Sequence, residues 1–82
     1  MERILEPYAV VRGRRLVGQA DDYDGWRLNQ RTPAVGDIGT LLDVLTAPGV
    51  ADWYIVESSD ANGTTVWLGD FLADELEAVQ TA

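Results

Sequence analysis

Turn-forming residues recur at short intervals along this chain, and the apolar runs between them are too short to sustain a helical period. The sharpest turn signal is Asn62-Gly63, which separates two runs rich in β-branched and aromatic residues. Asn-Gly between such runs indicates a hairpin, because these residues adopt the positive φ values that tight hairpin turns require. Short strands joined by close turns are typical of a small all-β domain.

The apolar runs predict five short strands, near residues 8–12, 40–45, 53–58, 64–69 and 76–79. Residues 13–34 are polar and Gly-rich with few apolar anchors, so we predict a long loop that folds back on the strands. Residues 73–75 fit a single 3₁₀ turn that leads into a short last strand. The spacing of Leu72, Leu76 and Val79 would also fit a short helix, and that alternative stays open.

Period-two alternation assigns the strand side chains to two faces. With Tyr54 and Val56 on the core face, Trp53 and Ile55 point outward. On the next strand the same alternation turns Val66 and Leu68 toward the core and Trp67 outward. The predicted core members are Leu41 or Leu42, Val44, Tyr54, Val56, Val66, Leu68 and Leu76.

Length and composition predict one domain spanning residues 1–82. A chain of 82 residues buries about 60% of its unfolded surface, which is enough for one modest core. Although the net charge is −8, 46% of the residues are hydrophobic and three are Trp, which is too apolar for a disordered chain. The start of the chain has no signal-peptide pattern and no segment approaches a membrane span, so we expect a cytoplasmic location.

Residue types that carry catalysis are scarce. The chain has no Cys and no His, so thiolate and zinc chemistry are excluded and no serine has a histidine to activate it. The acidic loops at 21–25 and 58–63 resemble calcium loops, but Arg31 and Gly69 occupy the position where a bidentate Glu is required. We therefore expect no enzymatic activity, no cofactor and no metal site.

Charge is unevenly distributed along the chain. All six basic residues are Arg and precede residue 32, whereas residues 32–82 contain nine acids and no base. Such a field repels nucleic acid and anionic membranes and attracts basic proteins. We expect a basic protein partner and no membrane, and the acidic field disfavours nucleic acid. The alternative, that the acids serve only solubility, stays open.

Four segments form a recognisable series: VGDIGTLLDV at 35–44, WYIVE at 53–57, Gly63 with VWL at 66–68, and ELE at 75–77. In this order they resemble small bacterial SH3-like domains, some of which are related to KOW modules. The resemblance covers about residues 35–79. It implies a single small SH3-like five-stranded barrel, with the long loop after the first strand and the 3₁₀ turn before the last.

Three tryptophans are many for a barrel of this size, and the alternation above predicts an outward cross-strand pair of Trp53 and Trp67. An exposed aromatic pair with an acidic rim has the anatomy of a protein-binding hot spot. The alternative is that one or two tryptophans fill the core. The predicted protein-binding residues are Trp53, Trp67, Ile55, Asp52, Glu57 and Asp70.

These features favour a non-catalytic protein-binding domain, for example an acidic immunity or antitoxin-like inhibitor of a basic toxin or effector. One alternative is an accessory or regulatory SH3-like module of a larger enzyme assembly. A KOW-like nucleic-acid-binding role is disfavoured by the acidic half, although the Arg-rich residues 12–15 keep it open.

Overall fold

The computed structural model describes residue 5 and residues 7–79, and it is an all-β structure. Its elements are β1 (Val10–Gly13), η1 (Ala20–Tyr23), β2 (Ile38–Leu45), β3 (Trp53–Ser59), β4 (Thr65–Phe71), η2 (Ala73–Glu75) and β5 (Leu76–Ala78). The five predicted strands are confirmed, with ends that shift by up to two residues. The 3₁₀ turn before the last strand is also confirmed, and the helix alternative for residues 73–79 is wrong.

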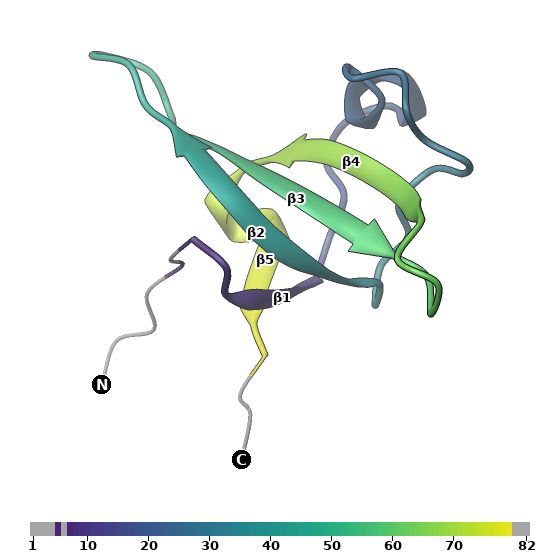
Figure 1. The fold of residues 1–82 in the computed structure, drawn as a ribbon. Coiled ribbons are helices and arrows are strands. Elements are labelled where there is room, and N and C mark those ends of the chain that lie inside the picture. The colour runs from purple at the N-terminus through teal and green to yellow at the C-terminus, as the bar shows by residue number, and fades with distance from the viewer. Residues whose placement is uncertain (1–4, 6, 80–82) are drawn as a thin grey trace.

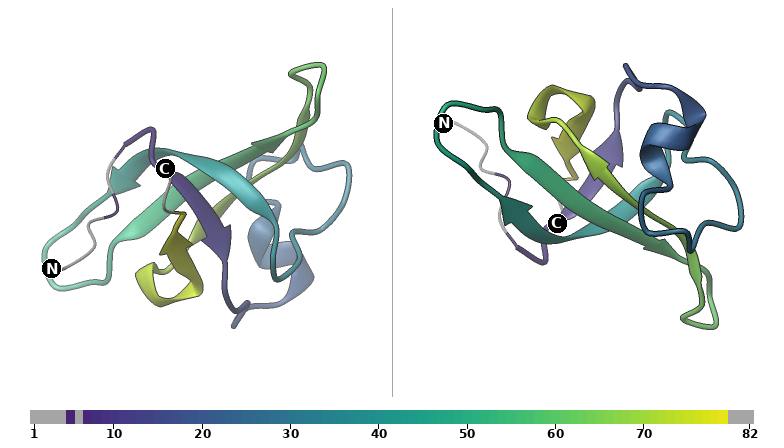
Figure 2. Two further views of the ribbon diagram at one scale, coloured as in Figure 1. Left: turned by 90° about the horizontal axis from the view of Figure 1, so that it is seen from below. Right: turned by 90° about the horizontal axis from the view of Figure 1, so that it is seen from above.

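All five strands belong to one antiparallel sheet with the order β4-β3-β2-β1-β5. The sheet is strongly curled, so β1 and β5 lie across the core from β3 and β4 in a barrel-like arrangement (Figure 1). The β2–β3 and β3–β4 turns project from opposite ends of the sheet (Figure 2). Register shifts at Leu41/Asp43 and Ser58/Ser59 mark β-bulges, which increase the local twist and help the sheet to curl.

The β3–β4 hairpin forms at the predicted Asn-Gly pair, but its loop is longer than two residues. Gly63 has the positive φ of 83°, and the Asp60 carboxylate accepts hydrogen bonds from the backbone N–H groups of Asn62 (2.9 Å) and Thr64 (3.0 Å). The Asp60 side chain thus stabilises the turn by accepting hydrogen bonds from its backbone, as short acidic side chains commonly do.

The turn into β2 depends on two glycines for two different reasons. Gly36 has a φ of +95°, which is strained for other residues. Gly39 has no room for a side chain, because a Cβ there would lie 2.7 Å from Val56 Cγ1 and 2.8 Å from the Glu57 carbonyl oxygen. The Gly-Asp-Ile-Gly segment is therefore a turn followed by a close approach of β2 to β3.

The core contains three of the predicted residues, Leu41, Val56 and Leu76, but the predicted faces of β4 are wrong. Leu68 is only partly buried, whereas Trp67 and Phe71 are buried. The register explains the inversion, because directly opposed residues share a face of the sheet. Core-facing positions on β3 stand opposite core-facing positions on β4 in three pairs: Tyr54 with Phe71, Val56 with Gly69, and Ser58 with Trp67. Three other predicted core residues, Val44, Tyr54 and Val66, are partly buried and pack against the core.

The long β1–β2 connection folds back on the sheet, as predicted. Tyr23 is buried in the core, with its ring centroid 5.2 Å from that of Phe71. Along the free edge of β4, Asn29 Oδ1 accepts a hydrogen bond from the Leu68 N–H at 2.8 Å, and the Gln30 N–H donates to the Val66 carbonyl at 2.7 Å. The connection therefore closes the core and covers part of a sheet edge that would otherwise be open to pairing.

Candidate binding site

Trp53 begins β3 and is the predicted binding residue that the structure leaves most accessible. Its side chain is 44% exposed, and its register partner on β2, Leu45, is 46% exposed. Val50, in the loop between these strands, is also exposed. The end of the β2–β3 hairpin thus presents an apolar patch that the main core does not use.

Trp67 does not belong to this patch, and the predicted pairing of the two tryptophans is wrong. Trp67 is 2% exposed and stands opposite Ser58, whereas Trp53 stands opposite Leu45. Positions 53 and 58 on β3 differ by an odd number of residues, so the two indole rings lie on opposite faces of the sheet. The Trp67 Nε1–H donates to Asp37 Oδ2 at 2.9 Å, which satisfies the polar group of a buried indole.

Ile55 points to the predicted face but is not a surface residue, because only 8% of it is exposed. It occupies the middle of β3 and stands opposite Asp43 on β2 and Asp70 on β4. A central strand has a neighbour on each side, so an aliphatic side chain at its middle is easily covered. Ile55 therefore offers little contact area to a partner.

The three predicted acids lie at different places along the sheet and do not form one rim. Asp52 precedes Trp53 and lines a shallow hollow that also includes Tyr54 and Asp74. Asp70 is partly buried and accepts a hydrogen bond from the Trp26 Nε1–H at 2.9 Å. Glu57 lies farther along β3, opposite Leu68, and accepts a hydrogen bond from the Thr65 hydroxyl. We therefore define the Trp53 surface as Leu45, Val50, Asp52, Trp53 and Asp70, without Glu57, Ile55 or Trp67.

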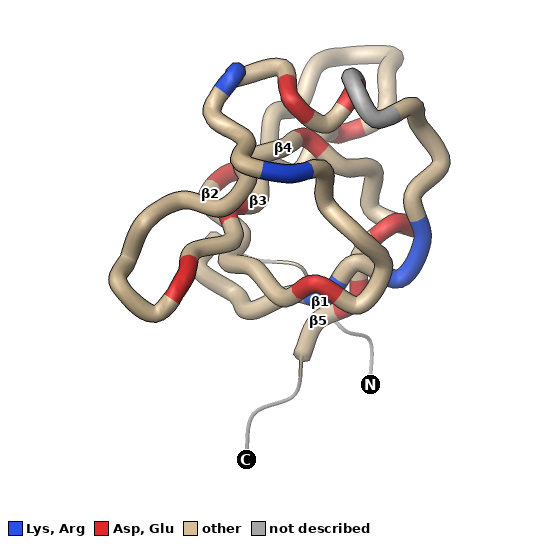
Figure 3. The backbone as a smooth tube through the Cα atoms, turned by 90° about the vertical axis from the view of Figure 1, so that its right-hand side faces the viewer, with Lys and Arg blue, Asp and Glu red and all other residues tan. Residues whose placement is uncertain are grey.

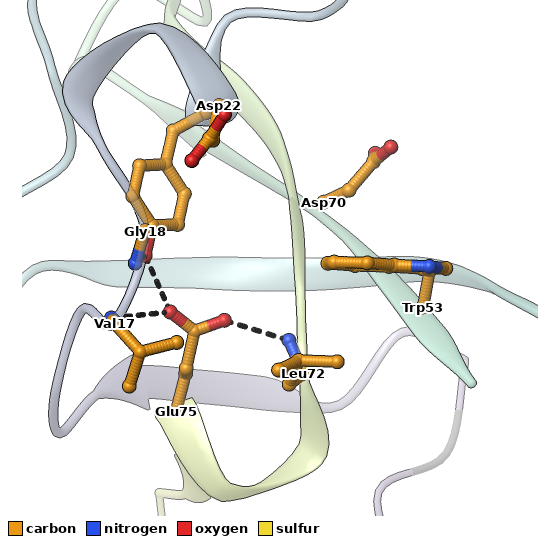
Figure 4. A pocket seen from close by; sticks show the side chains of 8 residues that line it. Val17, Gly18, Asp22, Trp53, Asp70, Leu72 and Glu75 are labelled. Carbon is orange, nitrogen blue, oxygen red and sulfur yellow. Dashed lines mark hydrogen bonds between the residues drawn. The ribbon is translucent and has the colours of Figure 1, made fainter. Parts of the chain in front are cut away.

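A pocket of about 410 Å³ adjoins this surface where the β1–β2 connection meets the end of β4. In Figure 4, Trp53 and Asp70 lie on one side of it, and Val17 and Gly18 lie on the other. We call this cavity the Trp53 pocket; its lining residues are Val17, Gly18, Asp22, Tyr23, Trp53, Asp70, Leu72 and Glu75.

Glu75 lines the Trp53 pocket and is only 1% exposed. Its Oε2 accepts hydrogen bonds from the Tyr23 hydroxyl (2.5 Å) and the Val17 N–H (3.0 Å), and its Oε1 accepts one from the Leu72 N–H at 2.7 Å (Figure 4). The Tyr23 hydroxyl in turn accepts from the Gly18 N–H at 2.8 Å. A buried carboxyl group with three donors thus connects the long loop to η2.

Burial and the hydrogen bond to Glu75 together raise the pKa of Tyr23 above its ordinary value. Loss of the phenolic proton would place a negative charge against a carboxyl group inside the core. Tyr23 therefore acts as a neutral hydrogen-bond donor over the physiological range, which suits a structural role.

The charged residues that line the pocket, Asp22, Asp70 and Glu75, are all acidic. The described basic residues lie in β1 or in the β1–β2 connection, whereas the charged residues of β2 to β5 are all acidic (Figure 3). Arg12 of β1 pairs with Glu77 of β5 at 3.1 Å, and Arg31 pairs with Asp37 at 2.7 Å. Two of the five described arginines are thus engaged with acids of this chain.

Within the described ranges, no group of three acidic, His or Cys side chains is placed to hold a metal ion. Over the same part of the chain, no helix has the length and apolar character needed to cross a membrane. No family model, curated protein or solved structure matches this chain.

Sequence reasoning found Trp53 and Asp70 of the pocket, and Asp52 outside it, but missed the other lining residues. Val17, Asp22 and Tyr23 come from the long connection, where no periodic pattern assigns side chains to a face. The only signal was the combination of Tyr23 with several acids in a loop otherwise poor in apolar residues. An aromatic residue in a largely polar loop is a reasonable candidate for the contact that anchors the loop.

Proposed function

We propose that this chain is a non-catalytic protein-binding domain of the SH3-like kind, and that it binds a basic partner through the Trp53 surface. The observation that carries the proposal is the half-exposed Trp53 beside the half-exposed Leu45, in a part of the chain without a basic residue. Aromatic anchors with a polar rim are where binding energy concentrates in protein interfaces.

The electrostatics favour a basic partner. Asp52 and Asp70 flank Trp53. All charged residues in the strands that carry this surface are acidic. A field of one sign speeds the encounter with an oppositely charged protein and discourages like-charged ones. A cytoplasmic immunity or antitoxin-like inhibitor of a basic toxin or effector would use the surface in this way.

A role as an accessory module of a larger enzyme assembly would use the same surface, and genomic neighbourhood distinguishes the two. A toxin or effector gene beside this one favours the inhibitor, and an enzyme operon favours the module. A KOW-like role is disfavoured because Arg12, part of the Arg-rich segment, is already paired with Glu77 of this chain.

Affinity capture from the source cell with the full chain tests the proposal, using wild type, Trp53→Ala and Leu28→Ala in parallel. Leu28 is an exposed apolar residue of the long connection and serves as the matched control. A genuine partner is retained by wild type and by Leu28→Ala. Loss of an aromatic anchor costs about 2 kcal/mol or more, roughly thirtyfold in affinity, so Trp53→Ala should release it. Capture that is equal for all three folded proteins would exclude the Trp53 surface as the interface.

A further inference from the structure

The Trp53 pocket has a chemistry that specifies more than a basic protein in general. Its wall is mainly apolar, from Trp53, Val17 and Leu72, while Asp22, Asp70 and Glu75 add carboxyl groups and none of the lining residues is basic. Its volume lies within the range of pockets that enclose a small ligand or a large side chain. The occupant must therefore bury an apolar stem and present positive charge.

The three carboxyl groups have different capacities for a ligand. Glu75 is buried and already accepts three hydrogen bonds from this chain. Asp22 accepts one, at Oδ2 from the Gln19 N–H (2.7 Å), and Asp70 accepts one, at Oδ1 from Trp26 (2.9 Å). Among the described residues nothing donates to the second oxygen of Asp22 or of Asp70, so each retains an acceptor for a ligand.

The elements that hold these groups make the arrangement rigid enough for recognition. The Trp26 indole holds Asp70, and Asp22 belongs to η1, whose last residue, Tyr23, is buried in the core. Trp53 starts a strand that is paired on both sides. Two acids and an indole ring therefore surround one cavity from three separate segments of the chain (Figure 4).

We propose that the Trp53 pocket binds an arginine side chain of the basic partner, with its stem against Trp53 and Val17 and its guanidinium group at Asp22 and Asp70. This inference rests on the proposed protein-binding function, and it names what the partner must present. A guanidinium group is planar, stacks on aromatic rings and carries five donors that can serve two carboxylates at once. A lysine ammonium group is more strongly hydrated and lacks that fork, so arginine is preferred.

Solution NMR of the full chain tests the pocket without knowledge of the partner. The probes are N-acetyl-arginine methylamide, the lysine analogue and the neutral citrulline analogue, which has nearly the shape of arginine. We expect arginine to shift the Trp53 indole N–H and the Val17 and Gly18 amides in a saturable way. Lysine should shift them less, citrulline should not shift them, and added salt should weaken the effect.

Variants then assign the interaction. Asp70→Asn keeps an oxygen to accept from Trp26 but removes the charge, and it should weaken arginine binding about three- to tenfold. Asp22→Asn should act in the same direction. The matched control is Glu77→Gln, an acid of β5 outside the pocket, which should leave the binding unchanged. Equal shifts by citrulline and arginine, shifts away from the pocket, or equal loss in Glu77→Gln would each overturn the inference.

The two proposals fail separately. If a captured partner requires Trp53 but binds Asp22→Asn and Asp70→Asn as tightly as wild type, the binding function is supported and the arginine pocket is contradicted. Saturable arginine binding at the pocket, with no partner that depends on Trp53, would keep the pocket and remove the proposed interface.

Discussion

Trp67 and Asp37, thirty residues apart in the chain, are joined by a hydrogen bond of 2.9 Å from the indole Nε1 to the carboxylate Oδ2. The same oxygen accepts from Arg31 Nη1 at 2.7 Å and from the Ala34 N–H at 2.9 Å. Asp37 thus connects the turn before β2 to the core face of β4. The acid of the Gly-Asp-Ile-Gly segment is a structural residue that satisfies a buried tryptophan.

Acid sensitivity should follow from Asp37. Partial burial alone would raise its pKa, but the hydrogen bonds from Arg31, Ala34 and Trp67 outweigh burial and lower the pKa of Asp37 below its usual value. Its contribution to stability is therefore complete above the pKa of an unfolded Asp, about 3.9, and is lost as the pH falls through the lower folded value. Asp37→Asn should lower the free energy of unfolding at pH 7 by about 1 to 3 kcal/mol.

The measurement is denaturant unfolding of wild type and Asp37→Asn between about pH 6 and pH 2.5. The difference between the two proteins should be largest at the upper end and should shrink below about pH 4. A difference that stays constant over this range would show that the charge of Asp37 contributes nothing to folding.

Gly39 should be intolerant of any side chain. The Cβ of alanine at this position would meet Val56 and the backbone of Glu57 inside normal contact distance, so Gly39→Ala should cost about 1 to 3 kcal/mol of stability. Gly25→Ala is the matched control, because a Cβ there meets nothing within 4 Å. It should leave the denaturation midpoint unchanged or slightly higher. Equal effects in the two variants would contradict the close approach of β2 and β3.

Glu75 should be a determinant of folding and not of binding. Glu75→Gln replaces one acceptor oxygen by a donor that faces other donors, and it should lower the free energy of unfolding by about 1 to 3 kcal/mol. Glu77→Gln, on the exposed surface pair with Arg12, should change it by less than about 1 kcal/mol. Thermal and urea denaturation decide this prediction, and a Glu75→Gln protein as stable as Glu77→Gln would refute it.

Tyr23 extends this prediction to high pH. Because its folded pKa is raised, its contribution to stability is complete below about pH 10, the value in an unfolded chain, and is lost as the pH rises through the folded pKa. Tyr23→Phe should therefore show a weaker alkaline loss of stability than wild type. The same unfolding experiment, repeated from about pH 8 to pH 11, measures it.

Local signals predicted the strands well because turns and short apolar runs are encoded locally. Gly36 and Gly63 both adopt positive φ, and Gly39 marks a close approach, so the turns around β2 and β4 could be predicted from glycine positions. Which side chains of β4 face the core could not be predicted in this way. Apolar residues occur at both alternating sets of positions, and only the long-range pairing of Ser58 with Trp67 selects one of them.

The pocket was even less accessible to sequence reasoning. It depends on the contact of Tyr23 with Glu75, whose positions in the chain are 52 residues apart. No local propensity reports such a contact. The acids of the pocket were visible as charges, but their division into a structural Glu75 and the available Asp22 and Asp70 follows only from burial and hydrogen bonding.

The tryptophans offer the sharpest test of how the sheet faces are used. Trp67→Ala would remove a buried ring that contacts Phe71, with centroids 5.5 Å apart, and should cost about 3 to 5 kcal/mol of stability. Trp53→Ala removes a half-exposed ring outside the core and should leave the protein folded with a much smaller loss. Circular dichroism with urea denaturation measures both.

Fluorescence provides an independent measurement on the unmodified fold. Acrylamide, which is uncharged and so is not repelled by the acidic surface, should quench Trp53 and Trp26 readily and Trp67 poorly, because Trp26 is also exposed. The emission that remains at high acrylamide should be blue-shifted and should disappear on unfolding. A Trp53→Ala protein that unfolds as Trp67→Ala does, or a quenching curve with three equally accessible indoles, would contradict the assignment of Trp67 to the core and Trp53 to the binding surface.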